Sequence, residues 1–293
     1  MQVGMTLPVM EPGQRRGTWE RWARAVDEGP FSSLALGERM AFGNPELMAL
    51  LGACAAWTSR VRLATTVIVA PLHDPVWLAK HLATVDVLCD GRLSVGLGIG
   101  GRLEDYRAAG ADAKGRTQAE LARRVAVMRR VWAGEPVYPD LLLPVGPPPV
   151  QPGGPSLLAG AQGPKSIRAS AAWADGISGF SFGPDLADIE QTLRLARSAW
   201  QEAGRPAPRL VIAFWYALGP GARDRITSHL RGYLNWLDPR EVETMLPHTG
   251  FAGTGPELRE LLRNVADLGA DEMLLIPTTA DVAEVARAAD LIG

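Results

Sequence analysis

The chain contains 293 residues, of which 47% are hydrophobic and 21% are charged, and its formal net charge is −2. These values are typical of a globular protein with a substantial core, and the length is compatible with a single α/β barrel. The small net charge gives no electrostatic reason to expect binding to nucleic acid or to an anionic membrane. No apolar run reaches the length that is needed to cross a bilayer.

Cysteine use and the first residues bear on the cellular compartment. Cys54 and Cys89 lie on apolar helix faces, which favours two core residues in a reducing compartment over a disulfide. The opening sequence MQVGMTLPVMEPG has neither the basic region nor the apolar run of a signal peptide. We therefore expect a cytoplasmic protein.

The expected elements alternate between strand and helix along the chain. Residues 61–66 are apolar or β-branched, as in a strand buried on both faces, Pro75 suits the first turn of a helix, and Gly91 suits its end. Residues 92–97 form the next strand, and this strand, helix, strand order predicts parallel pairing. The expected strands are 2–7, 33–36, 61–66, 92–97, 157–160, 176–180, 209–218 and 271–276.

Helical patterns occupy most of the stretches between these strands. Capping boxes are expected at 117–120 (TQAE) and 254–257 (TGPE). Among the expected helices are 18–27, 164–174, 184–203, 222–236, 239–246 and 281–291. Eight strands separated by helices predict an α/β fold, a single-domain (β/α)₈ TIM barrel over residues 1–293, whose site lies at the carboxyl ends of the strands.

One segment interrupts the alternation. Residues 135–155 contain eight prolines, a density that neither a helix nor a central strand tolerates. A long irregular segment inside a compact domain is commonly a lid or a binding loop. We therefore expect this segment to lie over or beside the mouth at the carboxyl ends of the strands, and a solvated spacer is the alternative.

The sequence GLGIGG at residues 96–101 follows an expected strand and fits the dinucleotide-binding pattern G-x-G-x-x-G. That pattern needs a second strand with an acid about twenty residues later, whereas residues 115–133 are typical of a helix. We instead expect Gly98 and Gly100 to let a flat ring approach the backbone at the barrel mouth. A tight turn without a ligand is the other interpretation.

A second loop has features of an anion site. Residues 161–166 (AQGPKS) join an expected strand to a helix that begins at Pro164. Backbone N–H groups at a helix start have no partner within the helix, and together with the helix dipole they attract an anion. An ordinary helix start capped by Gly163 is the alternative.

Three stretches together carry a family resemblance. They are LATTVIVAPLHDPVWLAKHLATVDVLCDGRLSVGLGIGG, LLAGAQGPKSIRASAAWADGI and GTGPELRELLRNVADLGADEMLLIP. They resemble the luciferase-like flavin- and deazaflavin-dependent oxidoreductase superfamily, which includes bacterial luciferase and enzymes that use coenzyme F-420. The resemblance weakens over residues 134–155 and 216–250. It implies a TIM barrel, a small-molecule substrate, a homodimer, and either coenzyme F-420 or FMN as the cofactor.

The resemblance also implies positions for the cofactor. A cis peptide bond between Thr66 and Val67 would form a bulge beneath the cofactor ring, although a plain strand fits the residues equally well. The loop after the fifth strand would hold the cofactor phosphate. The cofactor contacts expected on these grounds are Thr66, Val67, Gly98, Gly100, Gly160, Ala161, Gln162, Gly163, Pro164 and Phe180. Phe180, Tyr106 and Trp215 could face the ring, with core packing as the alternative for each.

Glu38 and Arg39 follow the second strand. Members of the superfamily often have an acid followed by a histidine here, and this chain has the acid but not the histidine. Glu38 is therefore the candidate acid or base, and an ion pair with Arg39 is its alternative role. The four histidines do not have the spacing of metal ligands, so we expect no metal site.

The leading hypothesis is an oxidoreductase that transfers a hydride to or from a small organic substrate through coenzyme F-420. Glu38 and the segments LATTV and GLGIGG look closest to that branch, whereas Arg39, Gly101 and Phe180 depart from it. The second hypothesis is an FMN-dependent monooxygenase that uses reduced flavin and oxygen. The third is a catalytically silent ligand-binding relative, which the missing histidine after Glu38 supports.

Overall fold

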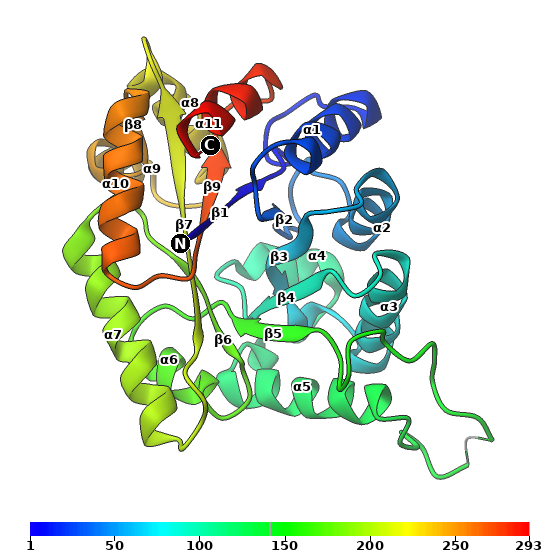
Figure 1. Cartoon of the computed structure of the whole chain (residues 1–293). Helices are drawn as coiled ribbons and strands as arrows, with labels where there is room; N and C mark the ends of the chain where they lie inside the picture. The colour runs from blue at the N-terminus through cyan, green and yellow to red at the C-terminus, as the bar shows by residue number, and fades with distance from the viewer. Residues whose placement is uncertain (141, 293) are drawn as a thin grey trace.

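The strands form a closed parallel barrel (Figure 1). The computed structural model describes residues 1–140 and 142–292, and the order around the barrel is β1-β2-β3-β4-β5-β6-β7-β9, with β9 pairing back to β1. The strands are β1 (Gln2–Thr6), β2 (Ser33–Leu36), β3 (Arg62–Val69), β4 (Leu93–Gly98), β5 (Ser156–Ala159), β6 (Gly176–Phe180), β7 (Arg209–Leu218), β8 (Phe251–Gly253) and β9 (Glu272–Pro277). The eight expected strands are thus all present, and the predicted TIM barrel is confirmed.

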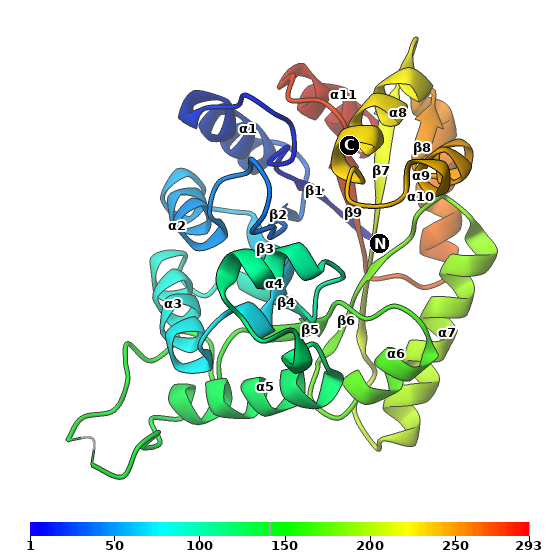
Figure 2. The same ribbon diagram turned by 180° about the vertical axis from the view of Figure 1, so that it is seen from behind.

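Helices surround the strands in both opposite views of the molecule (Figures 1 and 2). They are α1 (Arg16–Glu28), α2 (Leu47–Trp57), α3 (Pro75–Leu88), α4 (Leu103–Ala109), α5 (Gln118–Trp132), α6 (Pro164–Ser170), α7 (Leu186–Glu202), α8 (Ala222–Tyr233), α9 (Pro239–Met245), α10 (Gly255–Asp267) and α11 (Ala283–Ile292). Short 3-10 turns occur at η1 (Ala70–Leu72), η2 (Ala113–Gly115) and η3 (Leu246–His248). No helix in residues 1–140 and 142–292 has the length and apolar character that crossing a bilayer requires.

Several local features differ from the expectations. The sequence patterns did not predict α4 or the short strand β8, which pairs with the end of β7. The box at Thr254 is complete, because its hydroxyl and the Glu257 carboxylate each bond the other residue's backbone. At Thr117 only half of the expected box forms, since the Glu120 carboxylate instead binds Arg123 at 2.7 Å.

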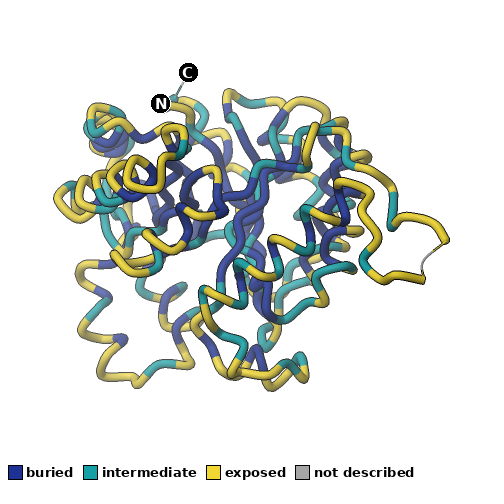
Figure 3. Tube along the Cα trace, turned by 90° about the horizontal axis from the view of Figure 1, so that it is seen from below, coloured by how far each residue is buried: buried dark blue, intermediate teal, exposed yellow. Residues whose placement is uncertain are grey.

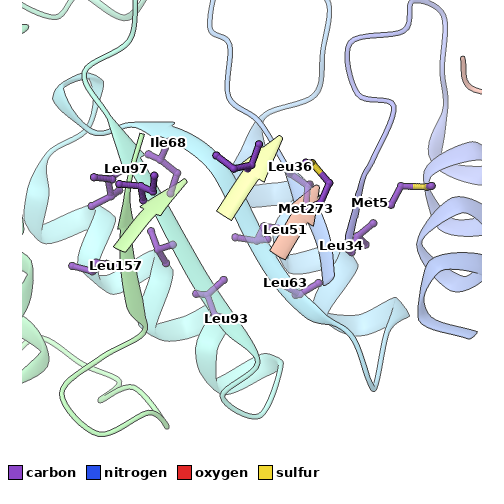
Figure 4. Packing of buried hydrophobic residues seen from close by; sticks show 14 of the residues in the cluster. Met5, Leu34, Leu36, Leu51, Leu63, Ile68, Leu93, Leu97, Leu157 and Met273 are labelled. Atoms are coloured by element: carbon purple, nitrogen blue, oxygen red, sulfur yellow. The ribbon is translucent and has the colours of Figure 1, made fainter. Parts of the chain in front are cut away.

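The core has two layers because side chains alternate along each strand. On β2, Leu34 and Leu36 point outward into the layer beneath the helices, while Ala35 points into the barrel. Figure 4 shows the outer layer, in which residues of several strands meet Leu51 of α2. Each large side chain that is buried in this way contributes roughly 1.5–3 kcal/mol to folding. Cys54 lies in the same layer as a free thiol, and burial raises its pKa to about 12.

A charge network around the buried Glu272 carboxylate lies at the amino-terminal end of the barrel. The hydroxyls of Ser32 and Ser33 each donate to the Glu272 carboxylate at 2.6 Å, and Arg209 donates to the same carboxylate at 2.6 Å. Arg62 adds a second cation at 3.8 Å. Burial alone would raise the pKa of Glu272, but the hydrogen bonds outweigh it and hold the pKa below its ordinary value.

The proline-rich segment 135–155 lies at this same end, so the expected lid over the barrel mouth is wrong. It leaves α5 and enters β5, and a helix-to-strand connection must return to the amino end of the next strand. Val150 and Gln151 donate backbone N–H groups to the buried Asp86 of α3 at 2.8 and 3.0 Å. The rest of the described segment extends away from the barrel and is largely exposed (Figures 1 and 3).

Candidate functional site

A cavity of about 550 Å³ opens at the carboxyl ends of the barrel strands, which is the end that the sequence predicted. Residues at the ends of the barrel strands line it together with residues of α8. The predicted residues among its lining are Glu38, Thr66, Val67, Gly98, Gly100, Gly160, Gln162 and Phe180. Ala161, Gly163 and Pro164 belong to the same loop as Gln162 but are not part of the lining.

A second depression, of about 680 Å³, lies beside the residues that follow β7 and β9. Arg225, Asp281 and Arg287 line it, and no predicted site residue does. Arg287 pairs there with Asp281 at 3.3 Å and with Glu284 at 2.7 Å, so its charge is already compensated within the chain. The cavity at the strand ends is therefore the better candidate for chemistry.

The expected bulge is present in β3. The Thr66–Val67 peptide bond is cis, and the pairing register between β3 and β4 shifts between Thr65 and Ile68. Thr65 anchors the bulge because its hydroxyl accepts from the Gly96 N–H at 2.9 Å and donates to the Gly96 carbonyl at 3.0 Å. This confirms the local structure that the family resemblance implied.

Three glycines at or just after the ends of β4 and β5 have a structural role within the chain. A Cβ atom at Gly98 or Gly160 would lie 2.9 or 2.7 Å from the side chain of Val67, and one at Gly100 would lie 2.7 Å from Val69. These glycines therefore make room for side chains of the neighbouring strand β3. Contact between the same glycines and a cofactor ring stays a prediction.

Glu38 is held on both carboxylate oxygens. Its Oε2 accepts from the Val69 N–H at 2.6 Å, and its Oε1 lies 2.7 Å from Nε2 of His73. The alternative role, an ion pair with Arg39, does not occur among the described residues, since the Arg39 side chain instead packs on the rings of Phe42 and Tyr233. The histidine that accompanies Glu38 thus comes from 35 residues further along the chain, which adjacent-residue patterns cannot reveal.

The loop before α6 leaves backbone groups near the cavity. Gln162 and Ser166 line the cavity, and the Ser166 hydroxyl donates to the carbonyls of Gln162 and Gly163 at 2.5 and 3.0 Å. Gly163 has φ +81° and open space beyond its Cα, so a glycine suits this turn. Lys165 and Arg168 are exposed beside it, and neither has a salt-bridging carboxylate among the described residues.

Aromatic rings form one wall of the cavity. Phe180 packs edge-on against Trp215 and Phe182, with ring centroids 4.8 and 5.2 Å apart. All three line the cavity. Tyr106, by contrast, is buried outside the lining and donates its hydroxyl to the Ile99 carbonyl at 2.6 Å, so core packing was the correct interpretation for this residue.

The sequence patterns missed a second acid–histidine pair. His229 of α8 lines the cavity, and its Nδ1 pairs with the carboxylate of Glu11, which lies between β1 and α1. The His229 side chain is 4% exposed, and its Nε2 has no hydrogen-bond partner within residues 1–140 and 142–292. The one available signal was that His229 and Tyr233 are four residues apart on one helix, and their rings do stack at 6.0 Å.

Comparison with known proteins agrees with this geometry. The family model of luciferase-like monooxygenases matches residues 1–257. An uncharacterized protein of Mycobacterium tuberculosis is 36% identical over 209 residues, which cover 64% of this chain and 73% of that protein.

Two solved structures share the fold over 99% of this chain. One is an F-420-dependent secondary alcohol dehydrogenase in complex with an F-420–acetone adduct (TM-score 0.83, 18% identity, 98% of that chain covered). The other is the oxygenating constituent of 3,6-diketocamphane monooxygenase from Pseudomonas putida in complex with FMN (TM-score 0.74, 17% identity, 95% of that chain covered). Because the family model spans most of the barrel and its bulged strand, this chain belongs to the luciferase-like monooxygenase family of oxidoreductases.

Proposed function

We propose that this protein binds the deazaflavin coenzyme F-420 in the cavity and transfers a hydride to or from a small organic substrate. The observation that carries the proposal is the cavity of about 550 Å³ at the carboxyl ends of the strands, which the bulged end of β3 lines in a chain of this family. The cofactor, when bound, supplies the hydride chemistry, and the protein supplies position and electrostatics.

The residues present fit such a group. Val67 offers an apolar surface, and Phe180 with Trp215 offers aromatic side chains against which a tricyclic ring can pack. The loop around Gly163, with Lys165 beside it, suits the cofactor phosphate. The chain's own contribution is to orient the ring and to exclude water from it.

Proton transfer needs a group of its own, because oxidising an alcohol or reducing a carbonyl moves a proton as well as a hydride. We propose His229 for this role, since Glu11 holds Nδ1 and Nε2 is left without a partner among the described residues. Glu38 is the other candidate, but both of its oxygens already have partners.

The two candidates can be separated by matched variants. We expect H229Q to lower kcat about a hundredfold or more while cofactor affinity is kept. E38Q should instead weaken cofactor binding, because Glu38 supports the backbone beside the bulge. A pH–rate profile of each variant gives the second readout. We expect H229Q to lose an ionisation that the wild-type profile shows. Loss of that ionisation in E38Q but not in H229Q would reassign the role to Glu38.

The cofactor is tested by titrating the purified apoprotein with coenzyme F-420 and with FMN under matched salt, following fluorescence. We expect micromolar or tighter binding of coenzyme F-420. Binding of FMN alone would contradict the proposal. The absorbance and mass of whatever copurifies from a host that makes both cofactors provides an independent check.

A second candidate function is an FMN-dependent monooxygenase. The family description and the apolar Phe180, at a place where the deazaflavin branch would favour a polar phosphate contact, both support it. Oxygen uptake that depends on reduced FMN and on an added organic substrate would favour this candidate. Tight cofactor binding without turnover across a broad substrate panel would instead favour a catalytically silent relative.

The phosphate position is tested at Gly163. Apart from the two neighbouring residues, no atom of the described chain lies within 4 Å of a Cβ at this position, so G163D and G163N should both fold. Both variants carry the same backbone cost of φ +81°. Only G163D adds a negative charge, so we expect it to weaken cofactor binding about tenfold more than G163N does. Equal affinities in the two variants would place the phosphate elsewhere.

We also propose a homodimer, on the resemblance to the superfamily. Trp77 and Leu88 of α3 are 61% and 58% exposed, which is compatible with a contact surface on that helix. Sedimentation velocity at micromolar concentration tests this, with W77S as the companion variant. A monomer under these conditions would contradict the proposal.

A further inference from the structure

Arg39 is buried in an unusual setting at the mouth of β2. Its residue surface is 6% exposed, and its guanidinium carbon lies 3.9 Å from the ring centroid of Phe42 and 4.7 Å from that of Tyr233. Its Nη1 donates to the Tyr233 carbonyl at 2.8 Å. Two aromatic rings and one hydrogen bond therefore hold the group in a defined orientation.

The remaining donors of this guanidinium are unused. Nε and Nη2 of Arg39 are buried and have no hydrogen-bond partner in the described part of the chain. These two nitrogens form one edge of the planar group, and such an edge presents two parallel N–H bonds to an acceptor. A whole bidentate edge of a residue that lines the cavity is thus without a partner in the described part of the chain.

The charge of Arg39 is also uncompensated. No carboxylate of residues 1–140 and 142–292 lies within salt-bridge distance of it. The nearby Asp105 accepts from the N–H groups of Met40 and Ala41 at 3.1 and 2.7 Å and lies 3.7 Å from Arg102. Burial of a guanidinium without a counter-ion is unfavourable, so this arrangement calls for an anion from outside the chain.

The position favours a substrate over the cofactor as the source of that anion. Arg39 follows β2 and contacts α8, whereas the loop expected to hold the cofactor phosphate follows β5. The bulged end of β3 and the glycines at the end of β4 lie between β2 and β5 in the barrel order. A ring placed on the bulge would thus have its phosphate on one side and Arg39 on the other.

We propose that Arg39 binds a carboxylate of the substrate through its Nε and Nη2 atoms, so that the substrate class is an organic acid. The two oxygens of a carboxylate match the two parallel N–H bonds, and an alcohol or a ketone alone does not. This inference rests on the proposed function, because it assigns the other side of the cavity to a flavin-type cofactor.

The test compares benzoate with benzamide, its neutral counterpart, as probes of the full chain. Dissociation constants from ligand-observed NMR at neutral pH and fixed ionic strength are measured for wild type, R39M, R39K and the control R129M. Arg129 lies on α5 outside the cavity lining and is bonded to the Trp173 carbonyl at 2.7 Å.

We expect wild type and R129M to bind benzoate about tenfold or more tightly than benzamide. R39M should lose this preference, and R39K should keep only part of it, because lysine has the charge without the planar edge. Equal binding of the two probes by wild type, or an unchanged preference in R39M, would overturn the inference.

Thermal unfolding distinguishes a ligand-binding arginine from a structural one. Ligand-free R39M should be at least as stable as wild type in thermal unfolding, and benzoate should raise the Tm of wild type but not of R39M. A large loss of stability in R39M, with R39K retaining the full benzoate preference, would show a structural arginine instead.

Titration of each variant with coenzyme F-420 and FMN tests the proposed function separately. If R39M lost cofactor affinity rather than benzoate preference, Arg39 would belong to the cofactor and the inference would fail.

Discussion

The two ends of the barrel differ in how one buried charged side chain at each end, Glu272 or Arg39, is compensated. At the amino-terminal end, the Glu272 carboxylate is met by Ser32, Ser33 and Arg209 at 2.6 Å and by Arg62 at 3.8 Å. At the carboxyl end, Arg39 has no carboxylate within salt-bridge distance in residues 1–140 and 142–292, and Nε2 of His229 has no hydrogen-bond partner there.

This difference separates stability from function. Buried polar groups in folded proteins normally have partners, so the Glu272 carboxylate, which accepts hydrogen bonds on both oxygens, needs no ligand. Donors that are left free beside a cavity are explained most simply by a molecule that binds there. Changes at the amino-terminal end should therefore alter folding alone, and changes at the carboxyl end should alter binding.

The largest expected effect is that of E272Q. Loss of the buried charge leaves Arg209 and Arg62 without their counter-ion, which typically costs about 3–5 kcal/mol of unfolding free energy. Urea unfolding followed by circular dichroism measures this cost. Cofactor affinity of the folded fraction should stay unchanged, and a specific loss of cofactor binding in E272Q would break the division between the two ends.

The pH dependence of stability gives a smaller effect of the same origin. Because the pKa of Glu272 is depressed in the folded state, its contribution is fully present above the ordinary carboxyl pKa of about 4.3. That contribution is lost as the pH falls through the lower folded-state value. Unfolding free energies measured from neutral pH downward should fall less steeply for E272Q than for wild type, and identical slopes would contradict the depressed pKa.

The substitution G160A probes the carboxyl end. Its new methyl group would lie 2.7 Å from Val67, so the bulge must shift, and overpacking of this kind costs about 1–3 kcal/mol. We expect weaker cofactor binding as well as lower stability. The control is G52A in α2, where the added carbon would meet no described atom within 4 Å beyond its chain neighbours and its own helix backbone, and it should gain about 0.5–1 kcal/mol instead.

The smallest expected effect concerns the proline-rich segment. Leu142 and Leu143 are 98% and 78% exposed and are not part of the cavity lining. The double change L142S and L143S should therefore leave both unfolding free energy and cofactor affinity within about 0.5 kcal/mol of wild type. A marked change in affinity would show that the segment reaches the cavity after all.

The sequence alone determined the features that depend on short stretches of chain. Strand and helix periodicity placed all eight barrel strands, and the barrel rule placed the site at their carboxyl ends. The LATTV stretch implied the bulge at Thr66–Val67 through a family resemblance, and the structure confirms it. The end at which residues 135–155 lie was also within reach, because a segment between a helix and the next strand must return to the amino-terminal end.

Only the tertiary structure decided which side chains meet across the mouth. His73 reaches Glu38 from 35 residues away, and His229 reaches Glu11 from 218 residues away. The free edge of Arg39 likewise depends on Phe42 and Tyr233 enclosing it from different elements. A local pattern carries the preference of a backbone for one conformation, whereas these pairings arise when barrel closure brings distant strand ends together.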